Sequence, residues 1–174
     1  MIRFQLFLIL LTPTIHLAAQ YDPSVEVLIH GLNLSEDMST LSSRNDELLL
    51  LIYGYDDSLK VDLPLTSAYF VLDSANRKKT VRVPCQSSTA VLLLLELDTN
   101  RTPEQLEPLV RKNLNAVLRL ARKGDRMGIQ KLIGDDDVMG YRILPKLCDP
   151  QSFSISCRFK LDKYAYGVSI TRER

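Results

Sequence analysis

The sequence predicts a mainly β fold, an antiparallel β-sandwich of about eight strands with one inserted amphipathic helix. Three observations predict it: short segments alternate between apolar and polar residues, turn-forming residues separate them, and one segment has helical periodicity. The 174 residues are 45% hydrophobic and 25% charged, which is typical of a globular domain and excludes a disordered or collagen-like chain. The formal net charge of +1 gives no general attraction to nucleic acid, so we expect no nucleic-acid partner.

The start of the chain has the features of a secretory signal peptide. Arg3 supplies a positive charge, an apolar run follows at residues 4–11, and a proline and small residues come after it. This run is too short for a transmembrane helix, which needs about 20 apolar residues. We therefore expect residues 1–19 to be a signal peptide, residues 20–174 to form a single sandwich domain, and the protein to be secreted or periplasmic.

Strand patterns dominate the rest of the chain. In the first strand Val25, Val27 and Ile29 recur with a period of two, which indicates one buried face. Residues 47–55 and 90–97 are almost continuously apolar, which is typical of strands buried on both faces. The last two segments alternate on either side of Asp162-Lys163 and are predicted to form a hairpin. The expected strands are residues 24–32, 47–55, 68–72, 79–83, 90–97, 153–161 and 164–171.

Residues 102–124 are predicted to contain one amphipathic helix, because apolar residues recur there every three or four positions. Thr102 and Gln105 have capping-box spacing, and Gly124 is a helix stop. Pro108 would lie inside this segment, so the helix begins either at the capping box or at Pro108 itself. The basic outward face is either an ordinary solvated face or a contact for anionic lipid; it carries Arg111, Lys112, Arg119, Arg122 and Lys123.

The expected export allows the three cysteines to form a disulfide, because disulfides form in oxidising compartments. Cys148 and Cys157 flank the turn signal Asp149-Pro150, and we expect these two cysteines to be bridged. Cys85, next to Pro84, would then be the unpaired cysteine.

Acidic residues gather at the expected strand ends, where loops of a sandwich meet. Asp98 and Asn100 follow the apolar strand 90–97, and Asp137 closes a run of three aspartates. Oxygen ligands on such loops suit Ca²⁺, which takes six to eight oxygens in flexible geometry. The simpler interpretation of the 135–137 run is a solvated turn.

The order of these segments resembles the C-two domain, the calcium-dependent phospholipid-binding β-sandwich of eight strands. Leu97-Asp98-Thr99-Asn100 and Asp137-Val138-Met139-Gly140 resemble the two halves of the family's third calcium loop, and Arg77-Lys78-Lys79-Thr80 resembles its basic strand. The helical segment would then be an insertion in that loop. The resemblance implies calcium as the cofactor, with the ligands Asp37, Asp46, Asp98, Asn100 and Asp137.

These observations leave three hypotheses of function. The first is a secreted, non-catalytic C-two-like binding module, with calcium as its cofactor, that acts on anionic lipid, an envelope component or a protein. The second is a carbohydrate-binding or adhesion sandwich whose surface carries tyrosines. The third is a hydrolase with paired carboxylates, but no Ser/His/Asp set, HExxH, P-loop or GxGxxG motif is present, so we expect no catalysis. His30 is expected to be a half-buried structural residue, and the candidate tyrosines are Tyr53, Tyr55, Tyr141, Tyr164 and Tyr166.

Overall fold

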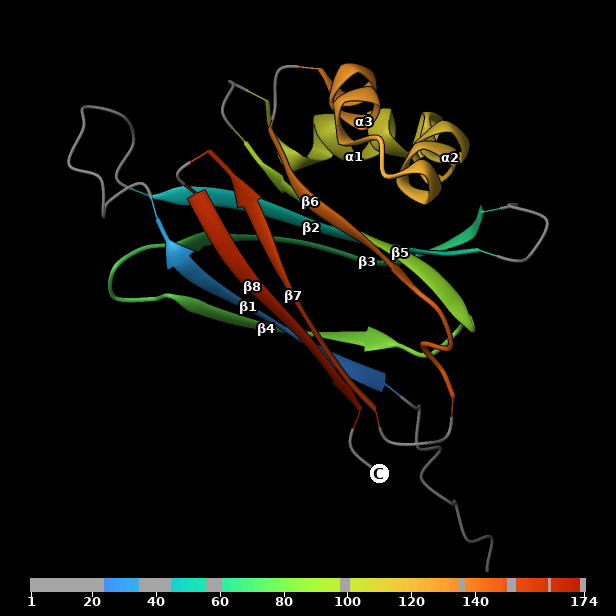
Figure 1. The fold of residues 1–174 in the computed structure, drawn as a ribbon, viewed down its shortest axis with the longest axis horizontal. Coiled ribbons are helices and arrows are strands. Elements are labelled where there is room, and N and C mark those ends of the chain that lie inside the picture. The colour runs from blue at the N-terminus through green and yellow to red at the C-terminus, as the bar shows by residue number, and fades with distance from the viewer. Residues whose placement is uncertain are drawn as a thin grey trace, which may run out of the picture.

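The computed structural model describes residues 24–34, 45–55, 61–97, 101–134, 137–149, 153–162 and 164–172. Within them lie eight strands and three helices (Figure 1). The elements in chain order are β1 (Ser24–Asn33), β2 (Asp46–Tyr55), β3 (Val61–Leu72), β4 (Lys78–Pro84), β5 (Thr89–Glu96), α1 (Pro103–Lys112), α2 (Leu114–Lys123), α3 (Arg126–Ile133), β6 (Asp137–Leu144), β7 (Phe153–Leu161) and β8 (Tyr164–Arg172).

The strands form two antiparallel four-stranded sheets, in the orders β4-β1-β8-β7 and β3-β2-β5-β6. We call these the first and second sheets. They pack face to face, so the predicted β-sandwich with a helical insertion is confirmed. The expected hairpin is β7 and β8, whose register runs from Leu161 opposite Tyr164 to Phe153 opposite Arg172. The strand expected at 68–72 is longer than predicted, because β3 begins at Val61.

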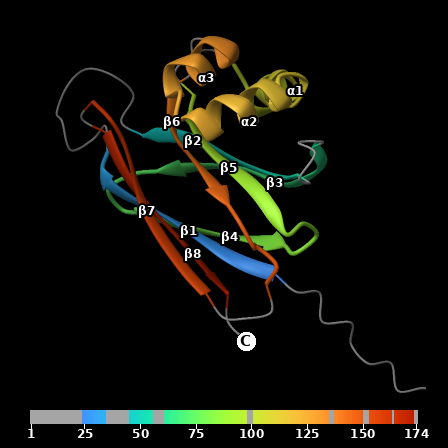
Figure 2. The ribbon, with the colours of Figure 1, turned by 45° about the vertical axis from the view of Figure 1, so that its right-hand side comes forward.

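The helices pack on the outer face of the second sheet, so the molecule has three layers (Figure 2). This arrangement explains the continuous apolar runs of β2 and β5. In β2, Leu48 and Leu50 face the first sheet, whereas Leu49 and Leu51 face the helices. Because both faces of β2 and β5 are covered, no polar alternation remains along them.

The insertion contains three helices where the sequence predicted one. Thr102 is the N-cap residue before α1, its N–H donating to Gln105 Oε1 at 3.2 Å, and Pro108 lies inside this helix. A break at Asn113 separates α1 from α2. Gly124 ends α2 with a φ of 74°, the left-handed conformation that glycine adopts without strain. The third helix, α3, was not predicted; Asp125 caps it by accepting from the Gly128 N–H at 2.8 Å.

Candidate functional site

One end of the sandwich brings together the ends of β1, β3 and β5 and the starts of β2, β4 and β6. The Gly31 N–H donates to the Arg77 carbonyl at 2.8 Å, which joins the end of β1 to the start of β4. The Leu97 N–H donates to the Glu47 carbonyl at 2.9 Å, which joins the end of β5 to β2. We call this the charged end, defined by His30, Asp46, Arg77, Lys78 and Glu96.

Two of the predicted calcium ligands lie at the charged end. Asp46 begins β2 and Asp137 begins β6, and β5 runs between these two strands. The other three predicted ligands, Asp37, Asp98 and Asn100, lie outside the described residues. Within the described ranges no group of three or more His, Cys, Asp or Glu side chains is arranged to hold a metal ion.

Asp46 is buried and turned toward the first sheet. Its side chain is 0% exposed, and its Oδ2 accepts a hydrogen bond from the Tyr166 hydroxyl of β8 at 2.5 Å. The bond therefore links the two sheets across the inner core. A buried carboxylate requires such a donor, because an uncompensated charge in the interior is costly.

Glu96 and Tyr166 complete this buried polar group. Tyr166 was predicted only as a candidate surface tyrosine for sugar binding, and Glu96 was not predicted as a site residue. Glu96 is 4% exposed and lies opposite Leu48 and Asp137 in the sheet register. The pKa of Tyr166 is raised above its ordinary value, first by burial, then by the charge of Glu96 and by the hydrogen bond to Asp46. Tyr166 thus keeps its proton and remains a donor.

Gly140, the glycine of the predicted calcium-loop motif, has a packing role here. A Cβ at this position would lie 2.1 Å from Cγ of Phe159 in β7. Phe159 is buried and lies opposite Tyr166 in the register of the first sheet. The glycine therefore allows the aromatic ring to approach the backbone of β6 beside the buried polar group.

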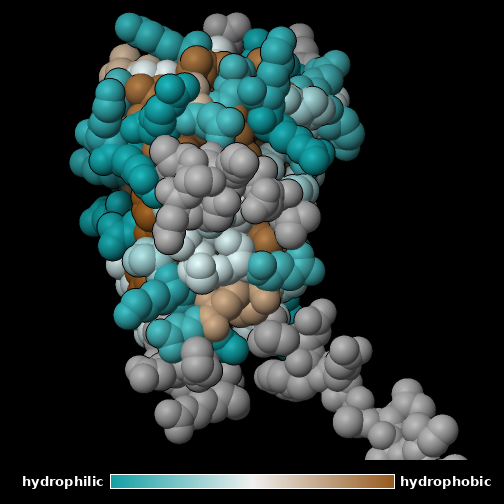
Figure 3. Space-filling view, turned by 90° about the vertical axis from the view of Figure 1, so that its right-hand side faces the viewer, coloured by the Kyte–Doolittle hydropathy of each residue, from teal (hydrophilic) through white to brown (hydrophobic). Residues whose placement is uncertain are grey.

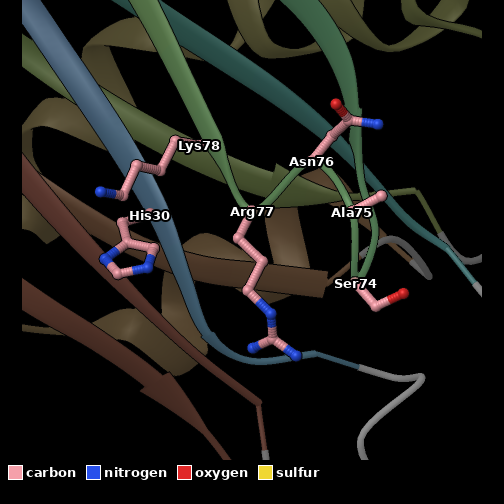
Figure 4. A pocket seen from close by; sticks show the side chains of 6 residues that line it. All are labelled: His30, Ser74, Ala75, Asn76, Arg77 and Lys78. Carbon is pink, nitrogen blue, oxygen red and sulfur yellow. The ribbon is translucent and has the colours of Figure 1, made fainter.

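An open pocket of about 400 Å³ lies at the charged end, beside the turn between β3 and β4. The turn is built by Asp73, which accepts from the N–H groups of Ala75 and Asn76 at 2.8 and 2.6 Å. These hydrogen bonds lower the pKa of Asp73. In Figure 4, His30 and Lys78 lie side by side on neighbouring strands, and Arg77 extends between His30 and the turn. The lining residues are His30, Ser74, Ala75, Asn76, Arg77 and Lys78.

The pocket continues into a row of residues across the exposed face of the first sheet. Lys78 lies opposite His30, His30 opposite Gly167, and Gly167 opposite Arg158. Directly opposed residues of antiparallel strands project from the same face. Gly167 leaves the middle of the row without a side chain. A Cβ built at this position would lie 3.7 Å from its nearest heavy atom, on Leu32, which is an ordinary contact distance. We call this row, made of Lys78, His30, Gly167 and Arg158, the basic row. Together with Arg77 of the pocket, it concentrates positive charge at the charged end.

The other predicted surfaces differ in their exposure. Tyr53, Tyr55 and Tyr166 are 1%, 3% and 0% exposed, so these tyrosines do not form a surface for sugar binding. Arg122 of the helical face lies over the ring of Tyr55, 5.5 Å from its centroid. In Figure 3 the helical layer at the top is covered mainly by hydrophilic side chains, as expected of a solvated face.

The expected bridge between Cys148 and Cys157 is absent from the structure, in which Cys85, Cys148 and Cys157 are all free. Cys157 lies within β7 and packs against the inner core. Cys148 instead donates from its thiol to the Ser87 carbonyl at 2.9 Å. Nearness in sequence is therefore a poor guide to the neighbours of Cys148.

Comparison of the sequence with models of known protein families and with curated proteins finds no match. Among the described residues, no helix combines the length and the apolar character required to cross a bilayer. The class that the fold defines is thus a two-sheet β-sandwich with a helical layer.

Proposed function

We propose that this chain is a non-catalytic, C-two-like binding module whose charged end attaches to an anionic lipid surface. The observation that carries the proposal is the pocket lined by His30, Arg77 and Lys78, in which none of the described lining residues is a carboxylate. Arg77 and Lys78 supply positive charge, while Ser74 and Asn76 supply polar groups, a combination that suits a phosphate-bearing headgroup. We further propose export through residues 1–19, which sequencing the N-terminus of the exported protein would test.

The basic row extends this contact from a pocket to a surface. Arg158 adds a cation on the exposed face that Lys78 and His30 already occupy. Glu26, on the same face, is paired with Arg82 at 3.3 Å, so its negative charge is locally balanced. Each Lys or Arg held near an anionic membrane contributes about 1 kcal/mol, so a few suffice for salt-sensitive binding.

Vesicle sedimentation tests the proposal. We expect the purified protein to bind vesicles that contain phosphatidylserine and to remain unbound with phosphatidylcholine alone. The double variant Lys78→Glu/Arg158→Glu should bind at least about tenfold more weakly. The matched control is Lys146→Glu, an exposed lysine on the turn after β6 at the other end of the sandwich, and it should bind as the wild type does. Equal binding by the double variant and the wild type would contradict the proposal.

Calcium dependence is a second proposal, favoured by the position of Asp137 at the same end of the sandwich as the pocket. Bound Ca²⁺ would neutralise carboxylates and attract lipid phosphate. Low-micromolar Ca²⁺ should then raise the melting temperature, and Asp137→Ala should abolish the rise. If millimolar Ca²⁺ leaves the melting temperature unchanged, the calcium proposal is wrong. The proposal that the pocket binds anionic lipid is then decided by the vesicle experiment alone.

The two remaining hypotheses have less support. A carbohydrate-binding surface would need exposed aromatic side chains, and three of the five candidate tyrosines are buried. A hydrolase would need two carboxylates in a cleft that a substrate can enter. Asp46 and Glu96, which are adjacent to Tyr166, are 0% and 4% exposed and lie in the interior. These positions favour binding over catalysis.

A further inference from the structure

At the end opposite the charged end, two thiols from distant parts of the chain come together. Cys85 directly follows β4, and Cys148 lies in the turn after β6, about 60 positions later. We call this the thiol end, defined by Cys85, Ser87, Leu147 and Cys148. Both cysteines are partly exposed, so a small reagent can reach them.

Crossed hydrogen bonds hold the two segments against each other. The Cys85 thiol donates to the Leu147 carbonyl at 3.7 Å, next to Cys148 in the chain. The Cys148 thiol donates to the Ser87 carbonyl at 2.9 Å, two residues after Cys85. The Leu147 N–H donates to the Ser88 carbonyl at 2.7 Å and fixes the spacing of the two backbones.

The two thiols are also close enough to influence each other's charge. Burial raises the pKa of the Cys148 thiol to about 12, and the neighbouring Cys85 thiol adds to this rise. Cys157 differs, because it lies in the middle of β7 opposite Val168. Burial raises the pKa of its thiol, the charge of Arg142 opposes this rise, and neither of the other cysteines contributes. The geometry therefore distinguishes one pair of thiols from the third.

We propose that Cys85 and Cys148 are an oxidisable pair that forms an intramolecular disulfide linking the β4–β5 loop to the β6–β7 turn. The oxidant is a disulfide, of low molecular weight or of a protein. One thiolate attacks it, a mixed disulfide forms and one oxidant thiolate leaves; the second cysteine then attacks the mixed disulfide, and the second oxidant thiolate leaves. One new S–S bond replaces the oxidant's S–S bond, and the two cysteine protons pass to the departing thiolates.

This bond would close a loop that contains β5, all three helices and β6. Such closure removes freedom from the unfolded chain, more for long loops than for short ones. Because the thiolate is the attacking form and the Cys148 thiol resists ionisation, oxidation should be slow at neutral pH and faster at alkaline pH. The charged end is remote from this bond, so oxidation should leave vesicle binding unchanged.

Peptide mapping of the wild-type protein tests the proposal without any substitution. The purified chain is incubated with oxidised glutathione, alkylated, digested without reduction and examined by mass spectrometry. We expect one cross-linked peptide pair that contains Cys85 and Cys148, with Cys157 alkylated. The melting temperature should rise by about 5–15 °C, and reduction should reverse the rise.

Two variants give a matched comparison. Cys157→Ala should keep both the cross-link and the rise in melting temperature, whereas Cys85→Ala should lose both. The proposal is overturned if the wild type yields a bridge that includes Cys157, or if excess oxidant yields no internal bridge in protein that retains its folded circular dichroism spectrum.

Discussion

The two ends of the sandwich differ in the chemistry on which they depend. The charged end holds a buried carboxylate and tyrosine, Asp46 and Tyr166, beneath a basic pocket. The thiol end holds Cys85 and Cys148, whose thiols bond to backbone carbonyls. Under our two proposals, the charged end binds an anionic ligand and the thiol end forms a disulfide. A single sandwich would then keep its binding surface and its covalent cross-link at opposite ends.

The largest effect on stability should come from packing beside the buried polar group. Gly140→Ala would force a methyl group against the Phe159 ring, so we expect a loss of about 1–3 kcal/mol in the free energy of unfolding. At the thiol end, a Cβ at Gly54 would lie 2.5 Å from Cβ of Ser87, a smaller side chain than the Phe159 ring, so the loss in Gly54→Ala should be smaller. Urea denaturation measures both.

Gly167→Ala is the control for these two variants, because a new methyl group there would make only ordinary contacts. It should change the free energy of unfolding by less than about 0.5 kcal/mol. An equal loss in Gly140→Ala and Gly167→Ala would contradict the packing role of Gly140.

Next in size is the hydroxyl that joins the two sheets. Tyr166→Phe removes the donor to the buried Asp46 carboxylate and should cost about 1–2 kcal/mol in the free energy of unfolding. Tyr53→Phe is the matched control on the other face of the second sheet. The Tyr53 hydroxyl is buried and has no hydrogen-bond partner among the described residues, so its removal should be neutral or slightly stabilising. Similar losses in the two variants would argue against the special role of Tyr166.

A smaller effect should appear in the dependence of stability on pH. The pKa of Tyr166 is raised in the folded protein above the value near 10 of an exposed tyrosine, and burial raises the pKa of Tyr53 to about 12. The stabilisation is therefore complete below about pH 10 and is lost as the pH rises further, because only the unfolded state then releases these protons easily. Melting curves between neutral and strongly alkaline pH should show this loss.

The thiol end should begin to lose stability earlier, near pH 9, because the Cys148 pKa is raised from 9.0 to about 12. Comparing Tyr166→Phe with Cys148→Ala separates the two ends. The tyrosine variant should lose less stability above pH 10 than the wild type, and the cysteine variant should lose less between pH 9 and 10. Parallel curves for both variants and the wild type would contradict the assignment.

Much of the fold was predictable because hydrophobic periodicity is local. The alternation of Val25, Val27 and Ile29 indicates that β1 has one buried face. The continuous apolar runs of β2 and β5 indicate that both faces of these strands are buried. The third helix was missed, although Asp125 and the spacing of Ile129 and Ile133 carry a signal, because Gly128 interrupts the pattern.

The candidate site was less predictable, because its members meet only through the topology. Asp46 was predicted to be a calcium ligand. In the structure its buried side chain points inward, like that of Leu48 two residues along β2, and accepts from Tyr166 of the other sheet, a partner that the sequence pattern does not show. Cys148 was predicted to pair with Cys157, the nearer cysteine in the sequence. Its neighbour in space is Cys85, which comes from the β4–β5 loop. His30 was expected to be structural, and its place in the pocket depends on its pairing with Lys78.

The most direct test of the central claim is an amide NMR titration of the reduced protein with glycerol 3-phosphate at constant ionic strength. The compound carries the phosphate of a lipid headgroup without a membrane. If the basic pocket is the binding site, shifts should concentrate at the amides of Gly31, Asn76, Arg77, Lys78 and Gly167, with no change at Ser87 or Leu147 of the thiol end. Shifts confined to the thiol end or to the helices, or no shifts at saturating phosphate, would contradict the claim.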